Sequence, residues 1–364
     1  MKRTRRRSNR APAARAAAAL IIAGGRGTRF WPESRAGRPK PLFAIDGRTS
    51  LLAGTIARMR GLIPPARIFV VVSADQRRPF RKALRGILPA GNLFVEPEGR
   101  GTAVAIAFGA AKIAKKLGAD TALAVMPADH HVAPADGFRA TISEAFDLAR
   151  AHDAIVVVGV TPASAETGYG YQQIGPALGS GYKVARFVEK PAPAVARRMV
   201  KSGRYLWNAG IFVMRAGVFE AELRRHAPQL AAAMERFAAV GARELPEVYR
   251  SLAFDSFDRV IVEKSRNVIG VRARFRWFDV GSWQGLWDAL RSDAAANVLS
   301  GNVIAFGSSG VLARGGERLM VLLGVSDLVA VDTGDAILIA RMSAAQEIRR
   351  VTEELARRGL KKFL

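Results

Sequence analysis

The sequence predicts an α/β protein with a mostly parallel sheet, followed by a small C-terminal β domain. Up to about residue 160, apolar strand-like runs alternate with helical runs, which is typical of a parallel sheet covered by helices on both faces. The first of these strands leads into a glycine-rich turn. After about residue 296, short β-rich runs recur between Gly, Ser and Asp, which favours a few coils of β-helix.

The elements follow from apolar runs of strand length and from longer runs with helical spacing. The first expected strands are 19–23, 68–73, 121–126 and 154–160. The expected helices are 51–61, 77–88, 102–117 and 138–151. The pattern from 160 to 290 is more mixed, with strands ending at residue 188 and over 211–214 and 275–280. The β domain is expected to comprise strands 302–306, 310–313, 319–323, 328–332 and 336–340 and a helix over 344–358.

Composition divides the chain and restricts its chemistry. We expect a basic disordered arm over residues 1–16, a catalytic α/β domain over 17–292 and the β domain with its terminal helix over 293–364. The net charge is +25, which suits polyphosphate substrates, and we expect no specific nucleic-acid partner. Because the chain has no cysteine, disulfides and thiolate metal sites are excluded.

The location also follows from the sequence. No apolar run reaches transmembrane length, so we expect no membrane partner. The basic start imitates a secretory signal peptide, but cleavage behind it would remove the first core strand and destroy the glycine-rich turn. We therefore expect a cytoplasmic protein.

The glycine-rich turn predicts a phosphate-binding loop. A strand that ends in such a turn leaves several backbone N–H groups free to face one anion. The expected phosphate-binding residues of the turn are Gly24, Gly25, Gly27 and Thr28. Arg29 and Lys40 add positive charge beside it, and an arginine can hold two phosphate oxygens at once.

Two aspartates at strand ends predict a magnesium site. Asp129 follows the apolar strand 121–126, and Asp279 lies at the end of strand 275–280. Ligands of a parallel sheet bind beyond the carboxyl ends of its strands, where these carboxylates should lie. Two carboxylates from different strands can share one Mg²⁺ that also binds phosphate oxygens.

A third group of residues has the chemistry of a sugar-phosphate site. Glu189 can accept hydrogen bonds from sugar hydroxyls, Lys190 can pair with a sugar phosphate, and Asn208 can both donate and accept. Gly168 and Gly170 permit close approach of the backbone. Read singly, Glu189 and Lys190 would be surface residues and Asn208 a turn residue.

Taken in order, these motifs resemble the bacterial mannose-1-phosphate guanylyltransferases, a family of sugar-phosphate nucleotidyltransferases. The resemblance covers residues 18–345. Its matching segments are GGRGTRFWPESR, RPK, EPEGRGTA, PADHHV, ETGYGYQQIG, FVEKP, YLWNAGIFVM, VIVEKS and WFDVGSW. It implies a Rossmann-like nucleotidyltransferase domain followed by a partial left-handed β-helix. It also implies that the EPEGRGTA segment contributes Glu96, Arg100 and Thr102 to the nucleotide site.

The implied reaction joins GTP and mannose 1-phosphate into GDP-mannose and pyrophosphate, with Mg²⁺ as cofactor. Arg29, Lys40 and Lys190 are the expected catalytic residues. The sugar phosphate is already ionised at neutral pH, so positioning and charge neutralisation suffice without a general base. The sequence leaves a homodimer open.

The choice of base and sugar rests on fewer residues than the reaction class. Pro41, Gly101, Val104 and the segment 256–258 depart from the family pattern. A glucose-1-phosphate nucleotidyltransferase that uses another nucleotide is the nearer alternative. The farther one is a non-enzymatic regulator that binds nucleotides or nucleic acid, although the complete set of charged site residues argues against it.

Overall fold

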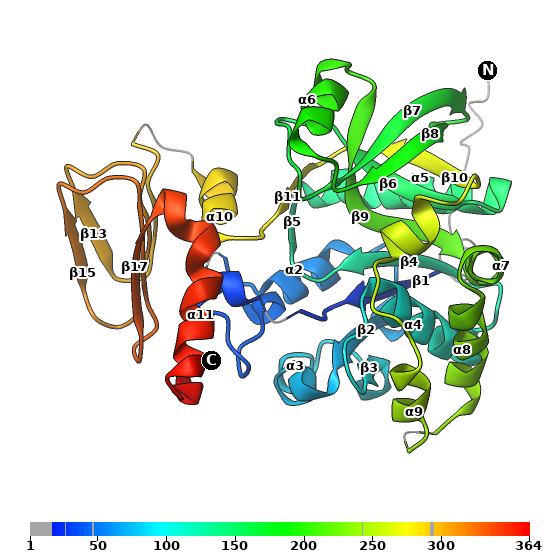
Figure 1. The fold of residues 1–364 in the computed structure, drawn as a ribbon, viewed down its shortest axis with the longest axis horizontal. Helices are drawn as coiled ribbons and strands as arrows, with labels where there is room; N and C mark the ends of the chain where they lie inside the picture. Colours follow the sequence, from blue (N-terminus) through cyan, green and yellow to red (C-terminus); the bar gives the residue numbers. More distant parts are fainter. Residues whose placement is uncertain (1–16, 26, 46, 242, 292–294) are drawn as a thin grey trace, which may run out of the picture.

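A computed structural model describes residues 17–25, 27–45, 47–241, 243–291 and 295–364 (Figure 1). The basic arm predicted over residues 1–16 lies outside the described residues, as does the predicted domain boundary at 292–293. A large α/β part and a smaller β part lie side by side, and α11 (Ile348–Arg357) packs where the two meet.

The α/β part is built on one nine-stranded sheet with the order β3-β2-β1-β4-β9-β6-β10-β8-β7. Its strands are β1 (Ala17–Ile22), β2 (Ile68–Ser73), β3 (Leu93–Glu96), β4 (Ala122–Pro127), β6 (Ile155–Val160), β7 (Gly170–Leu178), β8 (Gly181–Glu189), β9 (Tyr205–Arg215) and β10 (Val268–Arg272). The pairs β3–β2, β2–β1, β1–β4 and β6–β10 are parallel, whereas β9 and the β7–β8 hairpin run antiparallel to their neighbours.

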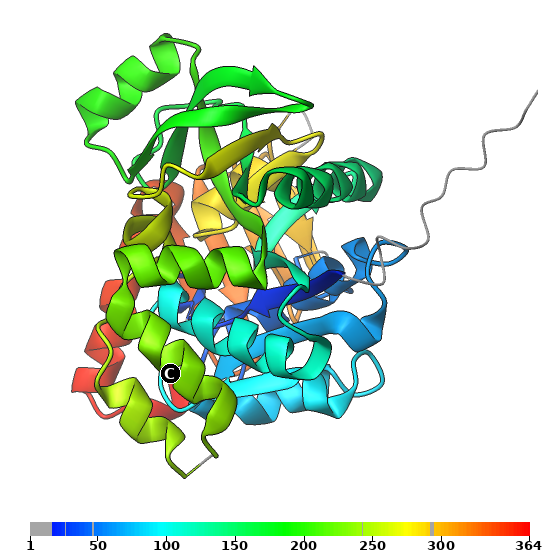
Figure 2. The same cartoon turned by 90° about the vertical axis from the view of Figure 1, so that its right-hand side faces the viewer.

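Helices cover both faces of this sheet (Figure 2). They are α2 (Leu51–Arg58), α3 (Arg77–Ala83), α4 (Thr102–Leu117), α5 (Ala135–His152), α6 (Pro193–Lys201), α7 (Ala216–His226), α8 (Pro228–Ala239) and α9 (Leu245–Arg250). Side chains alternate along β1, so Ala19 and Ile21 join the core under α2 and α5, while Ala18 and Leu20 join the core under α4 and α8. This alternation explains why a central strand has to be apolar throughout.

Two differences from the sequence-based expectation concern the ends of single elements. The helix expected over 77–88 ends at Ala83, because the chain turns at Leu84 and Gly86 has a φ of 77°. The strand expected over 211–214 is the last part of the longer β9, so Asn208 lies within a strand rather than in a turn before it.

A short two-stranded sheet stands apart from the main one. The chain forms β5 (His130–Ala133) directly after β4, and β5 pairs antiparallel with β11 (Arg276–Asp279). Only β11 was expected from the sequence. The pair places two segments that are far apart in the sequence next to each other.

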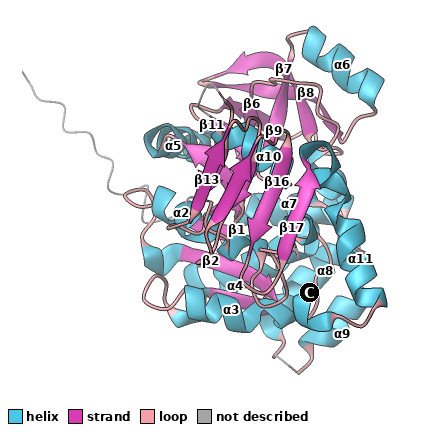
Figure 3. Ribbon diagram, turned by 90° about the vertical axis from the view of Figure 1, so that its left-hand side faces the viewer, coloured by secondary structure: helices cyan, strands magenta, loops and turns pink. Residues whose placement is uncertain are grey.

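The C-terminal β domain consists of two small sheets (Figure 3). Its strands are β12 (Val298–Ser300), β13 (Val303–Phe306), β14 (Leu312–Arg314), β15 (Met320–Leu323), β16 (Leu328–Asp332) and β17 (Ile337–Arg341). Parallel pairing of β12, β14 and β16, and of β13 with β15, is the arrangement of successive β-helix coils.

One apolar core joins the two parts of the molecule. Phe30 from the glycine-rich segment and Trp283 from α10 (Trp283–Leu290) pack with Leu312 of β14 and Ile348 of α11. The rings of Phe30 and Trp283 are 5.0 Å apart, edge to face. The β domain therefore packs against the segment that directly follows the predicted phosphate loop.

Candidate active site

The glycine-rich segment after β1 curves around a cavity of about 180 Å³. This phosphate-loop cavity is lined by Gly24, Gly25, Gly27, Arg29, Lys40, Asp129 and Gly281 together with neighbouring residues. Gly27 has a φ of 57°, and a Cβ atom there would lie 2.5 Å from the Cβ atom of Lys40. Only glycine fits this position, because any side chain would push Lys40 away. Thr28 lies in the adjoining 3₁₀ turn and lines a separate hollow beside α11.

Lys40 is the buried cation of the cavity. Its Nζ donates to Asp129 Oδ2 at 2.6 Å and lies 3.8 Å from Asp279 Oδ1. Burial alone would raise the pKa of Asp129, but Lys40 and His130 hold it below its usual value. The predicted pair of carboxylates is therefore brought together around one ammonium group.

The β5–β11 ladder is what brings the two aspartates together. Asp279 is paired with His130 in this ladder, and Asp129 is the residue just before His130. The indole N–H of Trp277 donates to His130 Nδ1 at 3.0 Å. Burial lowers the pKa of His130, and the nearby Asp279 and Asp129 only partly oppose this. His130 is thus a neutral imidazole that helps to hold the end of the ladder.

The carboxylate pair fits a magnesium ion that also binds substrate. In the described part of the chain, no group of three or more His, Asp and Glu side chains could hold a metal alone. Mg²⁺ commonly uses one or two carboxylates and completes its shell with phosphate oxygens and water. Asp129, which lines the phosphate-loop cavity, and Asp279, whose Oδ1 lies 3.8 Å from the Lys40 ammonium, match that donor set.

A larger cavity of about 620 Å³ adjoins the phosphate loop. We call it the nucleoside cavity because it contains Glu96 and Thr102, which the sequence predicts to bind the nucleotide. Its lining includes Gly24, Gly25, Gln76, Glu96, Gly101, Thr102, Phe254 and Ser256. Glu96 lies at the end of β3 and is only 4% exposed. Its Oε2 has no hydrogen-bond partner among the described residues. Burial raises the pKa of Glu96 to about 8. This oxygen can therefore accept a hydrogen bond from a ligand or a water molecule in the cavity.

Arg100 and Thr102, the two other residues predicted from the EPEGRGTA segment, both have hydrogen-bond partners, unlike Glu96 Oε2. Arg100 donates from Nη2 to Glu98 Oε1 at 2.6 Å and from Nη1 to the carbonyl of Leu252 at 3.4 Å, and it does not line the nucleoside cavity. Thr102 does line it, and its Oγ1 accepts from the backbone N–H of Phe257 at 2.9 Å.

The predicted sugar residues gather where β7, β8 and β9 meet. Asn208 donates from Nδ2 to Asp258 Oδ1 at 2.7 Å, while its Oδ1 accepts from the N–H of Gly210 at 3.1 Å. Lys190 Nζ lies 3.0 Å from Glu189 Oε1. Burial, with the charge of Glu189, raises the pKa of Asp258 to about 7.

The glycines predicted beside this group differ in their surroundings. A Cβ atom at Gly170 would lie 2.8 Å from the buried ring of Phe187 and 2.7 Å from Glu189 Oε2, so a larger residue there would have to displace the Phe187 ring. Gly168 is exposed, and a Cβ atom there would meet nothing within 4 Å.

The sugar group and the carboxylate pair are neighbours in space. Gly210 has a φ of 65°, and a Cβ atom there would lie 3.4 Å from Pro127 and 3.6 Å from the His130 ring. The ring of Tyr169 bridges Trp207 of β9 and Trp277 of β11, at centroid distances of 5.3 and 5.0 Å. Both groups therefore open onto one active-site region.

Sequence reasoning missed three residues of this region. Asp258 begins a π-helical turn (Asp258–Val262), and such turns are frequent at functional sites. Gln76 donates from Nε2 to the carbonyl of Gly25 at 3.0 Å, and its buried Oε1 has no partner among the described residues. The third is His130, which lay inside the quoted PADHHV motif and could have been found there.

The fold and this charged cleft define a phosphate-handling α/β enzyme. The chain belongs to the nucleotidyl transferase family, whose model matches residues 18–296. The model of a mannoseP isomerase/GMP-like β-helix domain matches residues 301–355. The predicted fold class and the predicted enzyme class are therefore confirmed.

Relatives in this family carry more specific names. A mannose-1-phosphate guanylyltransferase of Escherichia coli is 33% identical over 359 residues, covering 93% of this chain and 73% of that protein. One from Salmonella muenchen is 35% identical over 347 residues, covering 92% and 72%. A crystal structure from Thermus thermophilus, named mannose-1-phosphate geranyltransferase, matches with a TM-score of 0.86 and 36% identity over 94% of this chain and 99% of that one.

Within the described residues, the helices are all too short or too polar to cross a lipid bilayer.

Proposed function

We propose that this protein transfers the guanylyl group of GTP to mannose 1-phosphate, giving GDP-mannose and pyrophosphate. The names of its relatives support the reaction. The observation that carries the choice of nucleotide is the buried, unpartnered carboxyl of Glu96 in the nucleoside cavity.

Glu96 suits guanine for a stereochemical reason. The Watson–Crick edge of guanine presents two adjacent donors, N1–H and the exocyclic amino group, and a carboxylate can accept from both. Uracil and thymine present one donor on that edge. Because Glu96 is buried, ionising it against a base with a single donor would leave one carboxylate oxygen desolvated and unpaired, so bases that lack the second donor are disfavoured.

The reaction is an in-line displacement at the α-phosphorus of GTP. An oxygen of mannose 1-phosphate attacks, the bond to the β-phosphate breaks, and pyrophosphate leaves. We assign the N–H groups of the glycine-rich loop and Arg29 to the β- and γ-phosphates, and Lys40 to charge that develops at the α-phosphate. Asp129 and Asp279 would hold Mg²⁺, which when bound neutralises phosphate charge.

The sugar phosphate is assigned to the group around Asn208. Lys190 would bind the phosphate, and Glu189 and Asn208 would hydrogen-bond the mannose hydroxyls. Asp258, which already accepts from Asn208, fixes the orientation of that amide. Asn208 lies on β9, which pairs with β4, the strand that precedes Asp129, so a sugar bound there would lie near the carboxylate pair.

A pyrophosphate-release assay tests this function. ATP, GTP, CTP, UTP and dTTP would be offered with mannose 1-phosphate and with glucose 1-phosphate, with Mg²⁺ present. We expect the highest kcat/KM for GTP with mannose 1-phosphate. A higher value for glucose 1-phosphate with UTP or dTTP would establish the nearer alternative, and binding without turnover would favour the non-enzymatic one.

We further propose that the protein is a cytoplasmic homodimer that associates through its β domain. Ile304 is paired with Val321, and Phe306 with Leu323, and all four side chains are exposed on the β13–β15 face. Neither strand carries a charged residue, although the chain has a net charge of +25. A second copy can cover this face by two-fold symmetry without bringing like charges together.

Light scattering of the purified protein tests the dimer. We expect a dimeric mass for the native protein and a monomeric mass for the Val321→Glu, Leu323→Glu double variant. A native monomer would refute the proposal.

Cell fractionation tests the proposed location, and we expect the protein in the cytoplasmic fraction.

A further inference from the structure

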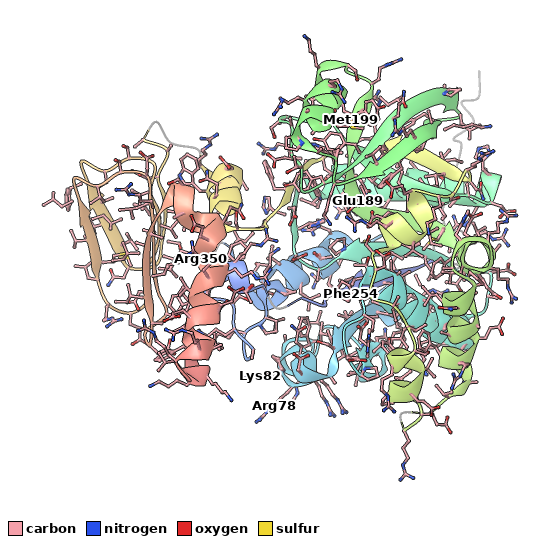
Figure 4. The ribbon with its side chains drawn as sticks, viewed as in Figure 1. Arg78, Lys82, Glu189, Met199, Phe254 and Arg350 are labelled. Atoms are coloured by element: carbon pink, nitrogen blue, oxygen red, sulfur yellow. The ribbon has the colours of Figure 1, made fainter. Side chains whose placement is uncertain are left out.

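Phe254 is an unusual residue in the α/β part of the molecule. Its side chain is 75% exposed. Every other large apolar side chain with comparable exposure in the described part of the chain lies at Leu299 or later. Phe254 lies on the loop between α9 and the π-helical turn (Figure 4), and it lines the nucleoside cavity. An exposed phenyl ring at the rim of a cavity gains stability only when something covers it.

The loop that carries Phe254 is tightly held. The carbonyl of Asp255 accepts from the N–H of Ala103 at 3.4 Å, and the N–H of Phe257 donates to Thr102 at 2.9 Å. A Cβ atom at Gly101 would lie 2.1 Å from the Asp255 carbonyl oxygen, so the two backbones touch. The exposure of Phe254 is thus imposed by a backbone that is fixed to the first turn of α4.

The same short segment contributes to both substrate sites. Phe254 and Ser256 line the nucleoside cavity, and Asp258 binds Asn208 at the sugar group. Glu96 lines that cavity as a buried hydrogen-bond acceptor, so it can contact only the hydrogen-bonding edge of a base. A base also has two apolar faces, and Phe254 is the aromatic side chain of the described cavity lining that can cover one of them.

We propose that Phe254 stacks on the base of the bound nucleoside triphosphate and so determines nucleotide affinity. This proposal rests on the proposed nucleotidyl transfer and adds a second contact to the base. Glu96 reads the hydrogen-bonding edge, whereas Phe254 contacts the aromatic face and therefore favours the larger face of a purine.

Steady-state kinetics of Phe254→Ala test the proposal. Stacking on one base contributes about a tenfold change in affinity or more. We expect KM for GTP, and for GDP-mannose in the reverse direction, to rise about tenfold. KM for pyrophosphate and for mannose 1-phosphate should change by less than about twofold, because neither has a base to stack.

Three further variants separate stacking from a structural role. Phe254→Tyr should restore the native KM for GTP, and Phe254→Leu should restore only part of it. Leu319→Ala, at a side chain that is 56% exposed in the β domain, should leave all constants unchanged. The melting temperature of each variant should stay at the native value, because these side chains are exposed.

The outcomes distinguish this inference from the proposed function. A native enzyme that turns over GTP, with an unchanged KM in Phe254→Ala, would overturn stacking alone. An equal rise in KM for pyrophosphate would also overturn it, since that points to a general loss of loop structure. If the native enzyme prefers another NTP, the proposed function fails, and the same measurement with that NTP still decides the stacking.

Discussion

Lys40 and Asp129 form a short ion pair of 2.6 Å at the mouth of the phosphate-loop cavity, and Asp279 lies 3.8 Å from the same ammonium. One buried cation thus partly offsets the charge of two carboxylates that come from distant segments. Without Lys40, the carboxylates would repel each other in a poorly solvated place. In the proposed reaction, Mg²⁺ and a substrate phosphate would share this space with Lys40.

Lys40→Met should therefore impair both stability and turnover. In EDTA, we expect its melting temperature to fall below that of the native protein, because two half-buried carboxylates lose their counter-charge. Added Mg²⁺ should raise the melting temperature of the variant more than that of the native protein. We expect kcat to fall by about 100-fold, as for loss of one preorganised charge. Lys201→Met, at an exposed position at the end of α6, is the control and should change neither property.

Asp129→Asn and Asp279→Asn should each lower kcat by on the order of 100-fold while the fold is retained, because asparagine removes charge that Mg²⁺ requires. The Mg²⁺ concentration for half-maximal activity should rise in both variants. Asp288→Asn, an exposed acid on α10, serves as the control. Near-native turnover of both variants at ordinary Mg²⁺ would mean that these carboxylates are not metal ligands.

The pH dependence of GTP binding follows from Glu96. Burial raises its pKa to about 8, so the free enzyme is mostly protonated at this side chain at pH 7. Guanine donors need the carboxylate, so binding releases a proton and KM for GTP should fall as pH rises from 6 to about 8. In Glu96→Gln the profile should be flat, with weaker discrimination against UTP. A native profile that is equally flat would exclude this role.

The free energy of unfolding should fall with rising pH, whereas GTP binding becomes tighter. The unfolded chain ionises Glu96 above about pH 4.5, but the folded protein keeps it protonated until about pH 8. The stability linked to this proton is fully present below pH 4.5 and is lost as pH rises through 8. Glu96→Gln should thus gain melting temperature relative to the native protein at pH 8 but not at pH 4.5. Thermal melts at both values check this.

At the sugar group, Asn208→Ala should raise KM for mannose 1-phosphate about tenfold, as expected for a lost hydrogen bond and an unpartnered carboxyl at Asp258. KM for GTP should be unchanged, since Asn208 does not line the nucleoside cavity. Asn267→Ala, whose amide binds the carbonyl of Asp153 on the surface, is the matched control. A parallel rise in both constants would contradict the assignment to the sugar.

The β domain is expected to hold the phosphate loop in place. Arg35 donates to both carboxylate oxygens of Asp335, at 2.6 and 2.8 Å, and the Trp31 indole donates to the carbonyl of Phe363 at 2.8 Å. Arg35→Met should lower kcat/KM for GTP several-fold, because the segment after the loop loses its anchor. Arg357→Met, which breaks a pair on the surface of α11, should not. Stopped-flow and steady-state assays can compare the two.

Much of the fold could be predicted from local patterns. The boundaries of β2 (Ile68–Ser73) and α4 (Thr102–Leu117) were predicted to the residue. Both are limited by sharp changes of hydrophobicity or by glycine, and such signals need no knowledge of distant contacts. The short β5 lacked such a signal, because its strand conformation is imposed by pairing with β11.

The sequence by itself determined the class of enzyme, the glycine-rich loop and the residue types that phosphate and sugar chemistry require, because motif spacing and strand ends are local properties. The assignment of those residues to substrates stays a prediction. Only the tertiary structure decided that Lys40 lies between Asp129 and Asp279, that Asp258 binds Asn208, and that Phe254 stands exposed beside the cavity of Glu96. Each of these relationships joins segments far apart in the chain. Their contact depends on sheet pairing and core packing, which local sequence patterns do not encode.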